Sequence, residues 1–330
     1  MIKIENVLSL FDGHSGLQIA LKELGIIPKN YFASEIDKHA IKATMQNFPN
    51  TIQLGSVVDI DVSKLPKIDF LSGGSPCQSF SFAGKRKGMS TICETEILTL
   101  EHYLQLKSEG YEFEGQSYLF WEYMRILTDL RKINPDIIFL LENVEMGKKW
   151  EGVLSKAIGI NGLHINSALV SAQNRERIYW LNWHTKKDGL FSFQYPNIPQ
   201  PKDRGIFLKD ILETEVDEKY YLSDKRIETI LKSERKVPYV DQETKKFNCL
   251  IAGYNKIPTD GQYVIEGNHS DMDLIVHNMM PRSSKSGKGG TGHLTRKGKT
   301  YCLDTGNTNA VEFVQQGIIK FGRNEEGKAM

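Results

Sequence analysis

Apolar runs that suit β-strands alternate with helix-like patterns over the first 183 residues, and this alternation constrains the fold more than any other feature. Strands are expected at residues 7–11, 31–34, 52–54, 68–71, 137–141 and 177–183, and helices at residues 17–24, 36–48 and 118–133. Such alternation is typical of an α/β fold with a doubly wound, largely parallel sheet. Open sheets of this class bind ligands at the carboxyl ends of their strands, so the turns there are candidate sites.

Composition sets the broad class of the chain. Its 330 residues, 40% of them hydrophobic, suffice for one large domain or two smaller ones. A net charge of +1 gives no global sign of a nucleic-acid partner, so any basic surface must be local. The four cysteines lie far apart without a C-x-x-C pair, which argues against a zinc site and a disulfide framework. No apolar run reaches the roughly 18 residues of a membrane span, and the N-terminus does not resemble a signal peptide. A reduced, cytoplasmic protein is therefore expected.

The composition of the chain changes after residue 183, where prolines cluster and helix-like patterns become rare. A second domain is expected at about residues 184–300. Residues 282–299 carry six Lys or Arg side chains, five glycines and no acid, among them Arg282, Lys285, Lys288 and Arg296. This segment is either a solvated loop or a flexible loop that contacts nucleic-acid phosphates.

The turn after the expected strand at 68–71 carries the sequence Gly73-Gly74-Ser75-Pro76-Cys77-Gln78. A strand that stops at two glycines leaves the next residues exposed at the carboxyl end of the sheet. Pro76 fixes its own φ, so the thiol of Cys77 points in a defined direction. Cys77 is then either a small buried apolar residue or a nucleophile.

A second turn, Phe11-Asp12-Gly13-His14-Ser15-Gly16, joins the first expected strand to a helix. Its glycines allow a ligand to approach the backbone closely. The turn lacks the G-x-G-x-x-G pattern, so a dinucleotide is not specifically indicated. Glu35 ends the next strand, where an acid can bind ribose hydroxyls, and together these features suggest an adenosine-containing cofactor.

Charged residues follow two further strands. Glu142 comes directly after the apolar run 137–141, where partial desolvation is expected to raise its pKa and let it carry a proton; the alternative is a solvent-facing cap. Alternation predicts Gln173, Arg175 and Arg177 on one face of a strand. Two arginines there could hold an anion or a carbonyl group, or form an ordinary charged surface edge.

Four motifs in order carry a family resemblance: Phe11-Asp12-Gly13 with Gly16, Pro76-Cys77-Gln78, Glu142-Asn143-Val144, and Gln173-x-Arg175-x-Arg177. Together they resemble the ordered motifs of C5-cytosine-specific DNA methyltransferases, most closely the phage and bacterial restriction-modification members. Residues 116–120 resemble the segment that lies against the cofactor adenine. The match covers residues 7 to about 183. It implies a Rossmann-like class I methyltransferase fold, a doubly wound mixed sheet with a smaller target-recognition domain.

The resemblance also implies a reaction and its participants. S-adenosylmethionine is the implied methyl donor, double-stranded DNA with a flipped-out cytosine is the implied substrate, and no metal is implied. The implied roles are attack of Cys77 on C6, contact of Glu142 with N3, and binding of the carbonyl O2 and a phosphate by Arg175 and Arg177, with Asn143 and Gln78 completing the catalytic pocket. Residues implied at the cofactor are Phe11, Asp12, Gly13, Gly16, Glu35, Ile36, Ser56, Val57, Pro76 and Leu119. Residues 79–93 resemble the mobile loop that closes over DNA; the expected DNA contacts are Lys85, Arg86, Lys87, Arg282, Lys285, Lys288 and Arg296.

The chain departs from the family pattern at two places. Gly55-Ser56 replaces a common Gly-Asp pair, so the adenine contact falls to Ser56, to backbone groups or to Asp59. The usual C-terminal Gly-Asn-Ala/Val element is not found in its usual context, and residues 304–311 resemble it only superficially, so 301–330 is expected to be a partial return to the catalytic domain. We therefore expect weak cofactor binding or a complementing C-terminal polypeptide. An RNA cytosine methyltransferase and a non-catalytic DNA-binding fragment stay as alternatives.

Overall fold

The computed structural model describes residues 3–76, 89–188, 193–213, 216, 222, 229, 239–240, 244–248, 263–265 and 300–302. The chain divides into two compact units, residues 1–165 with 176–200 and residues 166–175 with 201–330. Several expected features lie outside the described residues: Cys77 and Gln78, the cations of segments 85–87 and 282–296, and the element at 304–311. The functional domains expected at 1–183, 184–300 and 301–330 stay predictions.

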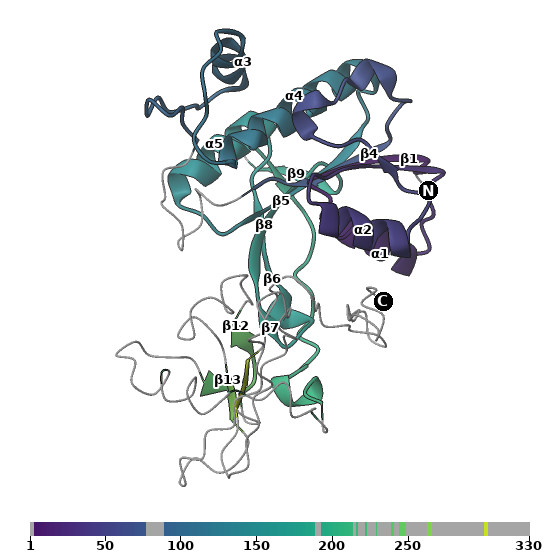
Figure 1. Cartoon of the computed structure of the whole chain (residues 1–330), viewed down its shortest axis with the longest axis vertical. Helices are drawn as coiled ribbons and strands as arrows, with labels where there is room; N and C mark the ends of the chain where they lie inside the picture. The colour runs from purple at the N-terminus through teal and green to yellow at the C-terminus, as the bar shows by residue number, and fades with distance from the viewer. Residues whose placement is uncertain are drawn as a thin grey trace, which may run out of the picture. The chain divides into compact units, whose positions relative to one another are not determined.

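A seven-stranded mixed sheet forms the centre of the first unit, in the order β3-β2-β1-β4-β5-β8-β6 (Figure 1). Its strands are β1 (Asn6–Leu10), β2 (Asn30–Ser34), β3 (Ile52–Gln53), β4 (Phe70–Gly74), β5 (Ile138–Val144), β6 (Leu163–Asn166) and β8 (Glu176–Leu181). Neighbours from β3 to β5 are parallel, whereas β8 runs antiparallel to β5. The doubly wound mixed sheet expected from the sequence is confirmed.

Helices cover both faces of this sheet, α1 and α2 on one side and α4 and α5 on the other (Figure 1). The helices are α1 (Gly16–Glu23), α2 (Lys38–Asn47), α3 (Leu100–Ser108), α4 (Phe120–Ile133) and α5 (Lys148–Ile158), with short 3₁₀ turns η1 (Val57–Asp59), η2 (Val62–Lys64), η3 (Ser117–Leu119), η4 (Ser167–Leu169) and η5 (Leu208–Asp210). Helix α2 begins two residues later than expected because the Asp37 side chain caps it, accepting from the N–H groups of His39 and Ala40. The sequence patterns did not predict α3 or α5.

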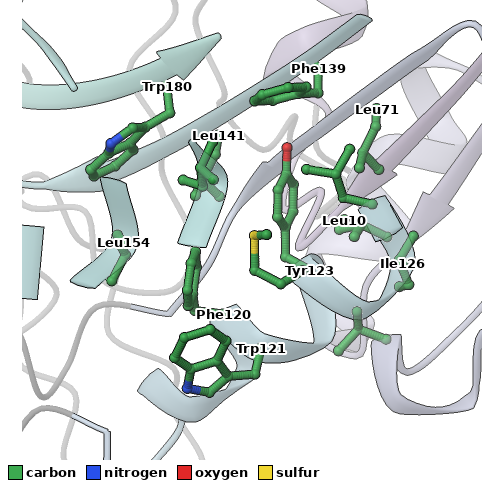
Figure 2. Close-up of a cluster of buried hydrophobic side chains, with 14 of the residues drawn as sticks. Leu10, Leu71, Phe120, Trp121, Tyr123, Ile126, Phe139, Leu141, Leu154 and Trp180 are labelled. Carbon is green, nitrogen blue, oxygen red and sulfur yellow. The ribbon is translucent and has the colours of Figure 1, made fainter. Parts of the chain in front are cut away.

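The main core lies between the sheet and helix α4 (Figure 2). Successive strand residues point to opposite faces, so Leu8 and Leu10 of β1 join this core while Val7 packs on the α1 side. Tyr123 rises from α4 towards the sheet between Leu71 and Leu141, and its hydroxyl donates to the carbonyl of Leu140 at 3.2 Å. This packing fixes β4 and β5, the two strands that carry Gly73-Gly74 and Glu142-Asn143 at their carboxyl ends.

A smaller core organises the described part of the second unit. Strands β7 (Gln173–Asn174) and β12 (Phe247–Asn248) pair in parallel, and a separate sheet contains β11 (Tyr239–Val240), β13 (Tyr263–Ile265) and β14 (Thr300–Cys302). Ala172, Leu208, Phe247 and Val264 are buried together. The hairpin of β9 (Thr185–Asp188) and β10 (Phe193–Pro196) belongs to the first unit. Among the helices that the structure describes, none is both long enough and apolar enough to cross a bilayer.

Candidate active site

Ser75, which directly follows β4, is held by a buried amide on the neighbouring strand. The side-chain nitrogen of Asn143 donates to the Ser75 carbonyl at 3.1 Å and lies 3.0 Å from the Ser75 hydroxyl. The Asn143 side-chain oxygen accepts from the Val144 N–H at 2.8 Å. Asn143 and Ser75 are both buried. Cys77 follows Ser75 by two residues in the sequence, so this link fixes the chain just before it.

The two glycines before this turn lie inside β4 and allow close packing. A Cβ on Gly73 would lie 2.9 Å from the Tyr123 ring, and one on Gly74 would lie 3.1 Å from Oε2 of Glu142. Both distances are shorter than ordinary van der Waals contact. Gly74 is also the register partner of Glu142, so the missing side chain allows the carboxylate to lie against the end of β4.

Glu142 forms an ion pair with Arg177 from the adjacent antiparallel strand β8. Nε of Arg177 lies 2.8 Å from Oε1 of Glu142, and a second guanidinium nitrogen donates to the Glu176 carbonyl at 2.7 Å. The Glu142 side chain is 31% exposed and the Arg177 side chain is 14% exposed. Glu142 belongs to β5 itself, whereas the sequence pattern predicted that it follows that strand. Its carboxylate is held by a charge-assisted hydrogen bond at the carboxyl edge of the sheet.

The expected single face of Gln173, Arg175 and Arg177 is wrong. Gln173 belongs to β7 and Arg177 to β8, and these strands are in different sheets. Arg175 lies between them with its N–H donating to the Asn166 side chain at 3.0 Å and its carbonyl accepting from Ser167 at 3.1 Å. Arg175 belongs to neither strand, so the alternation of a single strand does not run from Gln173 to Arg177.

The glycine turn after β1 adopts left-handed backbone at three positions, Phe11 (φ 56°), Gly13 (φ 56°) and Ser15 (φ 58°). Asp12 supports the turn, because its carboxylate accepts from the Tyr31 hydroxyl at 2.7 Å and from the Ser15 hydroxyl. Burial, together with the negative charge of Asp12, raises the pKa of Tyr31 far above its ordinary value, so the phenol remains a donor. Asp12 therefore shapes the turn, whatever it contacts in a ligand.

Glu35, directly after β2, ties three backbone segments together. Its Oε2 accepts from Gly13 N–H at 2.8 Å, and its Oε1 accepts from the N–H groups of Ile36 and Asp37 at 2.7 and 2.8 Å. An ionised carboxylate has about four acceptor sites, so one remains for a ligand hydroxyl. Gly13 and Glu35 thus meet at the carboxyl ends of neighbouring strands, as a nucleoside site requires.

The other residues expected at the cofactor occupy the same edge of the sheet or its loops. Ser34 at the end of β2 donates to the Gly55 carbonyl at 2.8 Å, which joins β2 to the turn that carries Ser56 and Val57. Val57 is buried, and Ser56 and Asp59 are half-buried and exposed, respectively. The remaining expected contacts are exposed (Gly16, Ile36) or half-buried (Pro76, Leu119).

The carboxylates at this edge of the sheet suit a nucleoside that carries a positive charge. Two carboxylates, Asp12 and Glu35, support the glycine turn directly, so a pyrophosphate there would meet like charge. An adenosine carrying a sulfonium cation would not. Exposed Ile36 and Val58, on the connections after β2 and β3, offer apolar surface for a flat ring. Within the described ranges, no group of three His, Cys, Asp or Glu side chains is arranged to hold a metal ion.

Sequence reasoning missed Ser75 and Tyr31 as supports of the site. The sequence pattern indicates only a turn residue at Ser75 and only a strand residue at Tyr31. The signals that could have found them are the buried Asn143 on the adjacent strand and the acid at position 12, each of which needs a partner.

The fold defines the doubly wound α/β class with a seven-stranded mixed sheet. A solved methyltransferase, EhMeth of Entamoeba histolytica, has the same fold with a TM-score of 0.57 at 16% identity, covering 80% of this chain and 77% of that one. The Dnmt2 methyltransferase of S. pombe gives a TM-score of 0.54 at 18% identity, covering 81% and 78%.

The family model of C-5 cytosine-specific DNA methylases matches residues 5–310, and the chain belongs to this family. The orphan methyltransferase M.SPRI of Bacillus phage SPR is 30% identical over 267 residues, 68% of this chain and 54% of the relative. The type II methyltransferase M.HpaII of Haemophilus parainfluenzae is 30% identical over 286 residues, 82% and 69% of the two chains. The chain spans about half the length of M.SPRI and of two other curated relatives that it matches, at 54%, 50% and 51%.

Proposed function

We propose that this chain transfers a methyl group from S-adenosylmethionine to C5 of a flipped-out cytosine in double-stranded DNA. One observation carries the proposal beyond family membership. At the carboxyl ends of β4 and β5, buried Asn143 holds the start of the Pro76-Cys77 turn, while the adjacent Glu142 is held by Arg177. A nucleophile-bearing turn and an oriented acid at one edge of a sheet suit a covalent reaction on a planar base.

Cys77 supplies the nucleophile. Its thiolate adds to C6 of cytosine, the S–C6 bond forms, and the electron pair of the 5,6 double bond becomes available at C5. S-adenosylmethionine would supply an electrophilic methyl group for that carbon; the C5–CH3 bond would form as the S–CH3 bond breaks, with neutral S-adenosylhomocysteine as the leaving group. A base, for which water suffices, then removes the C5 proton, the double bond re-forms and the S–C6 bond breaks.

Glu142 stabilises the addition step. Protonation of, or a hydrogen bond to, N3 of the base removes negative charge that develops as the thiolate adds. Arg177 orients the carboxylate through Oε1, and Oε2 lies against Gly74, three residues before Cys77. Arg177 and Arg175 are proposed to bind the carbonyl O2 and a nearby phosphate, Gln78 to line the pocket, and Asn143 to position the turn.

The cofactor is proposed to bind along the glycine turn and η1. Glu35 would accept from the ribose, and the connections after β2 and β3 would contact the adenine. The cations of segments 85–87 and 282–296 are proposed to bind phosphates, which is a salt-dependent contribution. A DNA substrate and a reduced thiol nucleophile suit the cytoplasm.

Covalent trapping tests the proposal. DNA with 5-fluorocytosine at the target should form a covalent complex in the presence of S-adenosylmethionine, because fluorine at C5 blocks the final elimination. Cys77→Ala should abolish trapping and leave DNA binding largely intact. Cys93→Ala is the matched control, since Cys93 is an exposed free thiol, and it should trap normally. Trapping that survives Cys77→Ala would refute the role of Cys77, and a chain that binds DNA but never traps would be a binding module.

Two further comparisons separate the remaining alternatives. Methyl transfer to tRNA but not to duplex DNA would identify an RNA methyltransferase. A complementing C-terminal polypeptide is also a proposal, and full activity of the 330-residue chain alone in a tritiated-methyl assay would refute it.

A further inference from the structure

A fully buried carboxylate outside the proposed catalytic pocket connects helices α3 and α4 of the first unit. Glu122 of α4 accepts from the Tyr103 hydroxyl at 2.5 Å, the Lys107 ammonium at 2.5 Å and Nε of Arg125 at 2.6 Å. Burial alone would raise the pKa of Glu122, but these three hydrogen bonds lower it below its ordinary value. Glu122 therefore stays ionised, and it requires its partners because an unpaired buried charge is costly.

Arg125 carries this network to the loop after β3. One terminal nitrogen donates to the Ile60 carbonyl at 3.1 Å, and the other donates to the Val57 carbonyl at 3.3 Å. The planar guanidinium thus binds Glu122 through Nε. Its two terminal nitrogens bind the carbonyls of Val57 in η1 and of Ile60, the residue that caps η1. A lysine has a single nitrogen at this position and could not reproduce all three contacts.

The loop that Arg125 braces belongs to the ligand edge of the sheet. Gly55, directly before Ser56 and η1, accepts from Ser34 at the end of β2, and Glu35 after β2 binds the glycine turn. The position of η1 is therefore set from two directions: by Ser34 at its start and by Arg125 across its carbonyls. Its outer side chain, Val58, is exposed.

We propose that Arg125 is a positioning residue for the cofactor, which acts by holding η1 where the adenosine end of the ligand binds. Glu122 supports this role indirectly, because its carboxylate orients the Arg125 guanidinium. The inference rests on the proposed function, in which S-adenosylmethionine occupies this edge. It adds a determinant of cofactor affinity that does not itself touch the ligand.

Calorimetric titration with S-adenosylhomocysteine tests the proposal. Arg125→Lys keeps a cation beside Glu122 but loses the fork, and it should raise the Kd at least fivefold and raise KM for S-adenosylmethionine with little change in kcat. Lys107→Met is the matched control: it removes another donor from Glu122 without touching η1, and the Lys107 side chain is 39% exposed. This control should leave the Kd within twofold.

A smaller rise in Kd for Arg125→Lys, or an equal rise in Lys107→Met, would overturn the proposal, because the network would then support only general stability. A second measurement uses the wild-type chain and does not depend on a variant that folds: saturating S-adenosylhomocysteine should slow hydrogen exchange at Asp59 and Ile60. Unchanged exchange there, despite binding, would also overturn it. Failure of the wild-type chain to bind the ligand at all would instead contradict the proposed function.

Discussion

Removal of the Asn143 amide should uncouple the Pro76-Cys77 turn from the sheet. Asn143→Ala deletes three side-chain contacts: two buried ones, to the Ser75 carbonyl and hydroxyl, and a partly buried one, to the Val144 N–H. A net hydrogen bond contributes about 1 kcal/mol, and a buried polar group left unsatisfied costs about 1–3 kcal/mol. We therefore expect a loss of about 2–4 kcal/mol in the free energy of unfolding, measured by urea denaturation.

The same variant should lose reactivity beyond its loss of stability. A displacement of about 1 Å in a reacting group can lower a rate about 100-fold, so trapping by 5-fluorocytosine DNA should slow by about that factor. The rate is measured at a temperature where circular dichroism shows the variant to be folded.

Asn134→Ala is the matched control for this prediction. Its buried side-chain amide donates to the Ile68 carbonyl at 2.8 Å, just before the other end of β4. It should cost about 1–2 kcal/mol by the same reasoning and leave the trapping rate within about threefold. A folded Asn143→Ala that traps at the wild-type rate, or an equal slowing in both variants, would refute a positioning role for Asn143.

Three further predictions follow from described contacts. Gly73→Ala should lower the free energy of unfolding by about 1–3 kcal/mol because it overpacks Tyr123, whereas Gly74→Ala should chiefly slow trapping by displacing the Glu142 carboxylate; the reverse pattern in urea and trapping assays would contradict this. Burial lowers the pKa of His164, but hydrogen bonds to Glu145 and Glu151 raise it above its ordinary value overall, so its stabilisation is full below about pH 6.5 and is lost as pH rises through the folded-state pKa. The free energy of unfolding of the wild type and of His164→Gln should be measured from pH 5.5 to 8.5. The difference between the two proteins should change by at most about 0.5 kcal/mol over this range, because the His164 side chain is half exposed. A difference that stays constant with pH would refute the prediction. Lys246→Met should destabilise the second unit by about 2–4 kcal/mol, because the ammonium donates to the carbonyls of Ala168, Ser171 and Ile206; unchanged protection of these residues' segments in hydrogen exchange would contradict this.

Local patterns predicted most of the central sheet. The apolar runs at 7–11, 31–34 and 137–141 correspond to β1, β2 and β5 because buried parallel strands are nearly continuous in apolar residues. Helix α3 buries only Tyr103 and Leu106, so its apolar pattern is weak. Helix α5 was missed although Trp150, Leu154 and Ile158 recur at helical spacing and are buried. Prediction of the common face for Gln173, Arg175 and Arg177 failed because β7 and β8 pair with partners in different sheets, with Arg175 between them, and sheet pairing is not a local property.

The sequence by itself determined the alternating α/β chain, the order of its motifs and the residue types of the candidate site, since hydrophobic period and turn chemistry are local properties. Only the tertiary structure decided the partners of those residues. Arg177 meets Glu142 because β8 runs antiparallel to β5, Asn143 meets Ser75 because β4 and β5 are parallel neighbours, and Arg125 reaches η1 because α4 packs across the sheet. Each of these contacts joins segments from about 30 to 70 positions apart, and strand order and helix packing, not local sequence, bring such segments together.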